Sequence, residues 1–133
     1  MDGSFQHPRF WKFFKNARGD RIVEQFITAQ AASDAAAIAV AMRRVQEKGV
    51  QAARHLRDEI YGVRVAGDKK QFRILFATEG AYNQVLLALE SFSKKTQKTP
   101  PDKIELAEQR LAEWRRLGEQ MRGERAPREQ SGQ

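Results

Sequence analysis

Three strand-like segments in the middle of the sequence, joined by short connections, constrain the fold more than any other feature. Apolar residues alternate with small or charged ones over residues 61–66, as in a half-buried strand, and over residues 72–76 Phe72, Ile74 and Phe76 alternate with Arg73 and Leu75. Residues 67–69 form a connection short enough for a hairpin. After a turn at residues 79–80, residues 85–89 are all apolar, which is typical of a central strand covered on both faces. The pattern predicts three consecutive antiparallel strands.

Helical patterns come before these strands. Aromatic residues are frequent over residues 5–15, which favours an opening strand. Asp20 can cap a helix whose apolar positions repeat at helical spacing, and Ser33 or Asp34 can cap a second helix. Gly49 supplies a left-handed residue at which the second helix is expected to end.

The clearest helix start lies near the C-terminus. Residues 99–102 read Thr-Pro-Pro-Asp, with a hydroxyl cap, prolines in the first turn and a carboxylate three positions on. An apolar stripe continues to Leu117, and from Gly118 the sequence is polar. We therefore predict an α+β domain over residues 1–117, in which a small, mostly antiparallel sheet packs against N-terminal helices and a C-terminal helix. Residues 118–133 are expected to form a flexible polar tail.

Composition limits the class of protein. A chain of 133 residues has room for one domain, and the absence of cysteine excludes disulfides, thiolate metal sites and cysteine nucleophiles. The longest apolar run, residues 35–42, is too short to span a bilayer, and residues 1–9 lack the features of a secretory signal. We expect a soluble cytoplasmic protein that does not bind membranes.

Positive charge is concentrated on the predicted strands and the loop after them. The net charge is +7 and the pI is near 10.1, which suits a phosphate-rich partner or an acidic protein. Between residues 64 and 98, three acidic residues stand against a larger basic set: Arg64, Lys69, Lys70, Arg73, Lys94, Lys95 and Lys98. Taken singly, each of these would also suit a solvated face or loop.

The basic residues converge on one region of the predicted sheet. Alternation assigns Arg64 and Arg73 to one face of neighbouring strands, and residues 92–100 can bring lysines to the same edge. Cleaving RNA without a metal requires a base for the 2′-hydroxyl, cations for the phosphorane and an acid for the leaving oxygen. Arginine carries a fixed charge for the phosphate, and like charges nearby lower the pKa of a lysine so that it can transfer protons. The pattern favours a metal-independent ribonuclease.

Other chemistries have little support. The two histidines, His7 and His55, are far apart in the sequence, so we expect no metal site and no cofactor. Glycine-rich phosphate loops and nucleophile elbows are absent. His55 is either structural or part of an RNA site, and Trp11 and Trp114 are expected in the core or in an interface.

Several segments resemble the phage-related branch of the RelE/HigB toxins. They are residues 73–76, 85–89, 92–100 and 104–107 and the opening Trp11-Lys12-Phe13-Phe14, and the run Lys94-Lys95-Thr96-Gln97-Lys98-Thr99-Pro100 is the most specific. The resemblance spans roughly residues 9–117. It implies a RelE-like fold and a type II toxin that cuts messenger RNA on the translating ribosome. Many relatives read Glu-Leu-Arg where this chain has Gly62-Val63-Arg64, so the glutamate is absent here.

Carried over position by position, the resemblance implies an RNA-facing set: Arg64, Arg73, Lys94, Lys95 and Lys98. We expect Arg64 and Arg73 to hold the scissile phosphate and Lys95 or Lys98 to move protons. The charge pattern adds Lys69, Lys70 and His55 as candidate RNA contacts.

The resemblance also implies partners. A cognate antitoxin, expected to be of the helix-turn-helix type, would neutralise the toxin, and messenger RNA on the ribosome would be the substrate. An alternative is a toxin of the related ParE branch, which acts on gyrase by protein binding without cutting RNA. The oligomeric state is left open.

Overall fold

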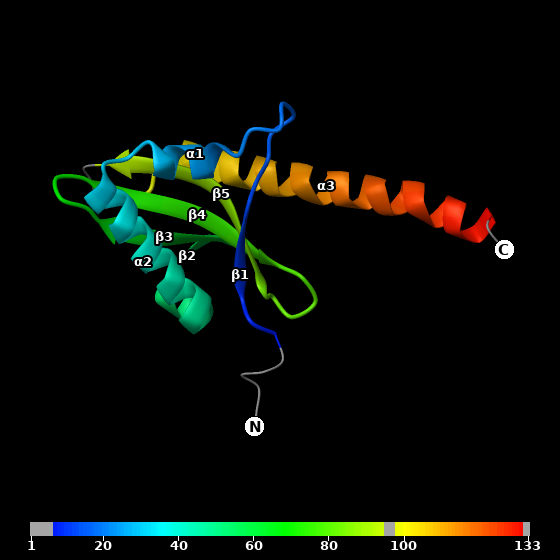
Figure 1. Ribbon diagram of the computed structural model, residues 1–133, viewed down its shortest axis with the longest axis horizontal. Coiled ribbons are helices and arrows are strands. Elements are labelled where there is room, and N and C mark those ends of the chain that lie inside the picture. The colour runs from blue at the N-terminus through cyan, green and yellow to red at the C-terminus, as the bar shows by residue number, and fades with distance from the viewer. Residues whose placement is uncertain (1–6, 95–97, 132–133) are drawn as a thin grey trace, which may run out of the picture.

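The computed structural model describes residues 7–94 and 98–131, with side chains for residues 7–93 and 98–121. These residues form one five-stranded sheet with helices on both faces (Figure 1). The elements follow in chain order: β1 (Phe10–Phe13), α1 (Ile22–Thr28), α2 (Ala32–Lys48), the 3₁₀ turn η2 (Gly49–Ala52), β2 (Arg54–Arg57), β3 (Ile60–Ala66), β4 (Gln71–Glu79), β5 (Val85–Lys94) and α3 (Pro101–Ser131).

The strands lie in the order β1-β5-β4-β3-β2. β3, β4 and β5 form the predicted antiparallel meander, β2 extends it, and β1 pairs with β5 in parallel at the opposite edge. β5 is therefore central, which explains its apolar run. The prediction of an α+β fold with a mostly antiparallel sheet is confirmed. The sequence does not predict β2, because residues 54–57 lack regular alternation.

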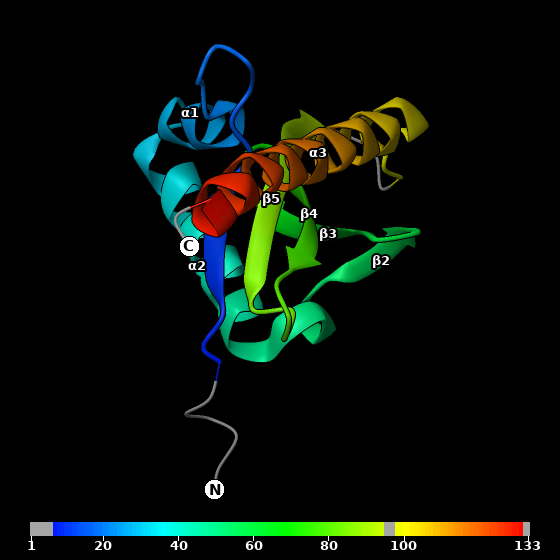
Figure 2. The ribbon, with the colours of Figure 1, turned by 90° about the vertical axis from the view of Figure 1, so that its right-hand side faces the viewer.

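Each face of the sheet has its own core. On one face, Ile38 of α2, Phe76 of β4 and Ala88 of β5 are fully buried in a core that α1 and α2 cover. On the other face, Leu75 and Leu87 belong to a core that α3 covers. Figure 2 shows α1 and α2 on one side of the strands and α3 on the other. Strand alternation supplies both cores from the same strands.

A β-bulge in β5 changes which of its residues face α3. Phe76 pairs with Ala88, but the adjacent residue of β4, Leu75, pairs with Glu90. Leu89 is the extra residue. Beyond it, the even-numbered residues of β5 turn from the α1–α2 face to the α3 face. The bulge thereby places the Glu90 carboxylate beneath α3.

Ion pairs attach α3 to the sheet. Glu90 is only 5% exposed and accepts hydrogen bonds from Lys103 Nζ at 3.1 Å and from Arg110 Nη1 at 3.2 Å. Arg110 Nη1 also donates to the Leu89 carbonyl at 2.7 Å. Three further ion pairs tie strand ends and the β2–β3 turn to α3: Arg57 with Glu108, Arg115 with Glu59, and Arg115 with Glu79.

The predicted N-terminal helix caps are wrong. Asp20 lies in a turn, where its N–H donates to the Asn16 side chain at 2.9 Å, and α1 has no side-chain cap. α2 has none either, because the helix already includes Ser33 and Asp34. The Asp34 carboxylate instead accepts the N–H of Asp68 at 2.9 Å, which ties α2 to the β3–β4 hairpin. A tertiary contact has replaced the local one.

Two glycines near helix ends behave differently. Gly49 takes a φ of 74° and ends α2, as predicted. Gly118 does not end α3, because a single glycine costs a helix only about 1 kcal/mol. The helix runs on to Ser131, whereas the sequence predicts a polar tail from residue 118. α3 is long but polar, and across the described residues no helix has both the length and the apolar character needed to cross a bilayer.

Candidate active site

Arg64 and Arg73 stand directly opposite each other on β3 and β4. Both lie on the α3 face, because they alternate with residues that belong to the core under α1 and α2. This is the arrangement that the sequence predicts. Their exposure differs, since Arg64 reaches solvent whereas Arg73 is only 2% exposed. Arg73 forms the floor of the site and Arg64 its rim.

The burial of Arg73 follows from its neighbours in the sheet. It lies between Arg64 on β3 and Phe92 on β5. Its Nη1 donates to the Phe72 carbonyl at 3.0 Å, and its Nη2 donates to the Gln71 side-chain oxygen at 3.4 Å. Burial, followed by the like charge of nearby arginines, lowers the pKa of Arg73. The side chain still stays protonated at neutral pH, so the floor carries a charge that a bound anion would stabilise.

A pocket of about 430 Å³ opens above this floor. It lies between β2, β3, β4, the turn before α3 and the start of α3; the β2–β3 hairpin and the start of α3 are both on the right in Figure 2. Four cations and five uncharged residues line it: Arg54, Arg64, Arg73, Lys98, His55, Leu56, Gly62, Thr99 and Ile104. Within the described part of the chain no Asp or Glu lines the pocket, so it attracts anions.

Arg54 is a pocket residue that sequence reasoning missed. It opens β2 and pairs with Gly62 of β3, two residues from Arg64. Asp58, which adopts a φ of 50°, lies in the turn that folds β2 back onto β3. A turn-forming aspartate shortly before the first strand of the predicted meander was the only available signal. Without that turn, nothing in the sequence brings Arg54 near Arg64.

Gly62 keeps the pocket wall free of a side chain. A Cβ at this position would lie 3.0 Å from Leu56 Cδ1 and 3.3 Å from Leu75 Cδ2, closer than ordinary contacts. Leu56 therefore packs over the position at which many of the resembling toxins are expected to carry a glutamate. With glycine at this position, no described residue of the pocket lining is acidic.

The predicted lysines do not all reach the pocket. Lys98 lines it. Lys69 and Lys70 are exposed in the β3–β4 hairpin turn and do not line it. Lys94 ends β5 beside the start of β4, at the same end of the sheet as this hairpin, on the left in Figure 1. The Lys94 side chain and the whole of Lys95 lie outside the described residues, so their roles stay predictions.

His55 borders the pocket but is engaged elsewhere. Its ring lies against Tyr61, with 5.2 Å between the ring centroids. Its Nε2 is 2.6 Å from the Asp58 carbonyl oxygen, and since a carbonyl can only accept, Nε2 carries the proton. The ring therefore helps to hold the β2–β3 turn. Its use as an RNA contact stays a prediction.

The arrangement suits the chemistry of a phosphodiester. Fixed cations bind the phosphate and stabilise the extra negative charge that develops during attack on phosphorus. Proton transfer needs groups that can change their charge, and Lys98 and His55 are the candidates in the described lining. Among the described residues, no three His, Asp or Glu side chains gather closely enough to hold a metal ion.

Fold and pocket together define a class of protein. A mostly antiparallel sheet between N-terminal helices and a C-terminal helix is a RelE-like architecture, and here it carries a basic pocket at one end. Residues 25–112 match the family described as Phage derived protein Gp49-like (DUF891). The chain belongs to this toxin-like family, which is related to the RelE-type toxins. No curated protein matches the chain significantly.

Proposed function

We propose that the chain is the toxin of a type II toxin–antitoxin pair of the RelE/HigB type and acts as an endoribonuclease on messenger RNA at the translating ribosome. Its partners are the ribosome-bound transcript and a cognate antitoxin of the helix-turn-helix type, and it acts in the cytoplasm. Membership of a toxin-like family supports the toxin role. The basic pocket supports the RNA substrate.

One observation carries the proposal. Arg64 and Arg73 face each other across neighbouring strands, in a pocket that Arg54 and Lys98 complete and that no described acidic residue lines. Such a site favours phosphate, whereas a lining carboxylate would repel it. A volume of about 430 Å³ is within the range of pockets that hold small ligands, so one nucleotide can enter.

The proposed reaction needs only side chains. A base removes the proton of the 2′-hydroxyl, the 2′-oxygen attacks phosphorus, and the bond from phosphorus to the 5′-oxygen breaks as an acid protonates that oxygen. The products are a 2′,3′-cyclic phosphate and a 5′-hydroxyl. Arg64 and Arg73 hold the phosphate and stabilise the phosphorane. Lys98 or Lys95 moves the protons.

Transcript ends mapped by primer extension during brief expression test this proposal. Arg64→Ala and Arg73→Met should lower cleavage by about 10²-fold or more, because each removes a cation from the transition state. Arg43→Ala, an exposed arginine of α2 on the other side of the sheet, is the matched control and should cut like the parent chain. Cuts confined to translated regions support action on the ribosome. A fully active, folded Arg73→Met variant would show the site assignment to be wrong.

The ParE-like alternative gives a different result in the same cells. Transcripts would stay intact while replication stalls, because the cations would then dock an acidic protein surface and not cut RNA. Intact transcripts from a toxic parent chain would therefore exclude the ribonuclease proposal and favour this alternative.

A further inference from the structure

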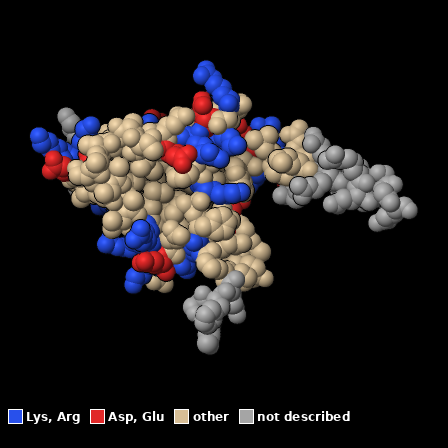
Figure 3. Space-filling view, in the orientation of Figure 1, with Lys and Arg blue, Asp and Glu red and all other residues tan. Residues whose placement is uncertain are grey.

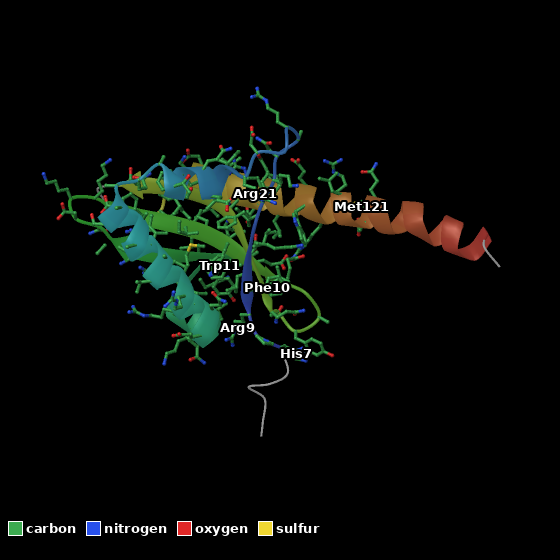
Figure 4. The ribbon with its side chains drawn as sticks, in the orientation of Figure 1. His7, Arg9, Phe10, Trp11, Arg21 and Met121 are labelled. Atoms are coloured by element: carbon green, nitrogen blue, oxygen red, sulfur yellow. The ribbon has the colours of Figure 1, made fainter. Side chains whose placement is uncertain are left out.

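A second recess lies beside β1, at the opposite edge of the sheet from β2. Its volume is about 690 Å³, larger than the 430 Å³ of the arginine pocket. We call it the edge groove and define it by its α3 wall (Trp114, Leu117 and Met121) and its opposite rim (Lys12, Lys15 and Arg21). Figure 4 labels Trp11 on β1, Arg21 before α1 and Met121 on α3, which all border this groove.

The α3 wall is an apolar stripe open to solvent. Trp114, Leu117 and Met121 recur at intervals of three and four residues and so share one helix face. Earlier on this stripe, Ala107 and Leu111 are buried against the sheet. Leu117 is 42% exposed and Met121 is 65% exposed, because α3 has left the sheet by then (Figure 1). The N-terminal part of the stripe is therefore buried in the core, and its C-terminal part is exposed on the surface.

The opposite rim has a net positive charge, because its three basic residues outnumber Glu24, which also lines the groove. Lys12 on β1, Lys15 in the next loop and Arg21 before α1 are all exposed. Arg21 makes only a 4.0 Å contact with Glu24, between two half-exposed side chains. Lys12 and Lys15 form no ion pair with any residue that the structure describes. Figure 3 shows Lys and Arg side chains in the middle of this face, so the rim offers positive charge to a partner.

We propose that the edge groove docks an acidic segment of a partner protein, whose apolar side chains cover the α3 wall while its carboxylates contact the basic rim. Charge selects this occupant. A second copy of the chain would bring its own net charge of +7 toward a basic rim, which disfavours self-association. RNA would neutralise the rim but leave Leu117 and Met121 without an apolar partner.

The edge groove is separate from the arginine pocket. β1 and β2 are the two outermost strands, and the sites share only α3, which meets the pocket at Ile104 and the groove from Trp114 onward. With a rise of 1.5 Å per residue, Ile104 and Trp114, the groove residue of α3 nearest to the pocket, are about 15 Å apart along the helix. A segment bound in the groove leaves the pocket open, so the docking proposal does not depend on RNA cleavage.

Selection of random peptides on phage against the full-length chain tests the proposal. We expect the enriched peptides to combine Asp or Glu with apolar residues. Met121→Glu should weaken their binding at least about tenfold, since it puts a like charge into the wall. Val40→Glu makes the same kind of change at a 57%-exposed site on α2 and should have no effect. Peptide anisotropy measures affinity, and tryptophan emission should shift because both tryptophans line the groove.

Three results would overturn the proposal. The first is a selection that enriches no acidic peptides, or one whose enriched peptides bind the Met121→Glu variant as tightly as the Val40→Glu variant. The second is binding that Arg64→Ala abolishes and Met121→Glu does not, because such peptides occupy the arginine pocket. The third is a dimer of the chain in sedimentation that Met121→Glu dissociates. Peptide binding that survives in a cleavage-deficient Arg64→Ala variant supports docking whatever the fate of the ribonuclease proposal.

Discussion

The face of the sheet under α1 and α2 and the face under α3 are closed by different kinds of contact. Under α1 and α2 the buried core is apolar apart from Ser91, which pairs with Ile74 on this face. Under α3, apolar residues share the interface with Glu90, bound by Lys103 and Arg110, and with the buried Arg73. The strands supply Arg73 and Glu90 to this face only, and α3 supplies the cations that bind Glu90.

α3 differs from the N-terminal helices because it covers only part of its face. It contacts β5, β4 and β3 and then runs past the sheet, as Figure 1 shows. The uncovered part near β2 is the arginine pocket. Buried charge is costly unless solvent or a partner reaches it, so a basic site can form only where the helix cover is incomplete. The largest contribution to stability is therefore expected from the α1–α2 face, and RNA binding from the uncovered part of the α3 face.

The largest expected effect is on the α1–α2 face. Phe76 is fully buried and packs edge-on against Trp11, with 5.2 Å between the ring centroids. Phe76→Ala should lower the free energy of unfolding by about 3–5 kcal/mol, because it leaves a cavity. Urea denaturation measures the change. Tyr82→Ala, at an aromatic side chain that is 63% exposed, is the control and should stay within about 0.5 kcal/mol. A loss below about 1 kcal/mol for Phe76→Ala would contradict the assignment of the main core.

On the α3 face, we expect the buried carboxylate to matter more than an exposed one. Glu90→Ala leaves Lys103 and Arg110 without their counter-charge and should lower the free energy of unfolding by about 2–3 kcal/mol. Glu24→Ala, which removes an exposed carboxylate 4.0 Å from Arg21, should cost at most about 0.5 kcal/mol. Equal midpoints in urea for the two variants would mean that Glu90 does not anchor α3.

A smaller effect is expected when a cation of the pocket is removed. Arg54→Ala should weaken binding of single-stranded RNA about tenfold, and the slope of log affinity against log salt should become shallower by about 0.7 for one lost phosphate contact. Fluorescence anisotropy over a salt series gives both values. Arg44→Ala, an exposed arginine of α2, should leave them unchanged. If the slope is unchanged in Arg54→Ala, Arg54 does not contact an RNA phosphate.

The smallest predicted effect concerns pH and an ion pair in the middle of α3. A hydrogen bond from Arg115 lowers the pKa of Glu59 in the folded chain. The stabilisation is therefore complete above the unfolded pKa, about 4.3, and is lost as the pH falls through the folded value. Glu59→Gln should cost about 0.2–1 kcal/mol at pH 7, since the pair is exposed. In thermal unfolding, the difference in stability between Glu59→Gln and the parent chain should shrink below about pH 4. A difference that stays constant with pH would show that the Glu59–Arg115 pair does not cause it.

Much of the fold could be read from local patterns, while the site could be read only in part. Alternation over residues 61–66 and 72–76 placed Arg64 and Arg73 on one face before any pairing was known. Arg54 could not be assigned to the site from the sequence, because only the turn at Asp58 brings β2 beside β3 and Arg54 near Arg64. The burial of Arg73 also depends on Phe92, which a bulge in β5 turns to the same face.

The sequence by itself determined the meander, the C-terminal helix start at Pro101 and the basic character of one strand face, because these depend on periods and caps within a few residues. The tertiary structure decided that β1 joins β5 in parallel, that Asp34 binds Asp68 instead of capping α2, and that α3 covers only part of its face of the sheet, as Figure 1 shows. Contacts between residues so distant in the chain depend on which surfaces bury each other best, and no local pattern encodes that choice.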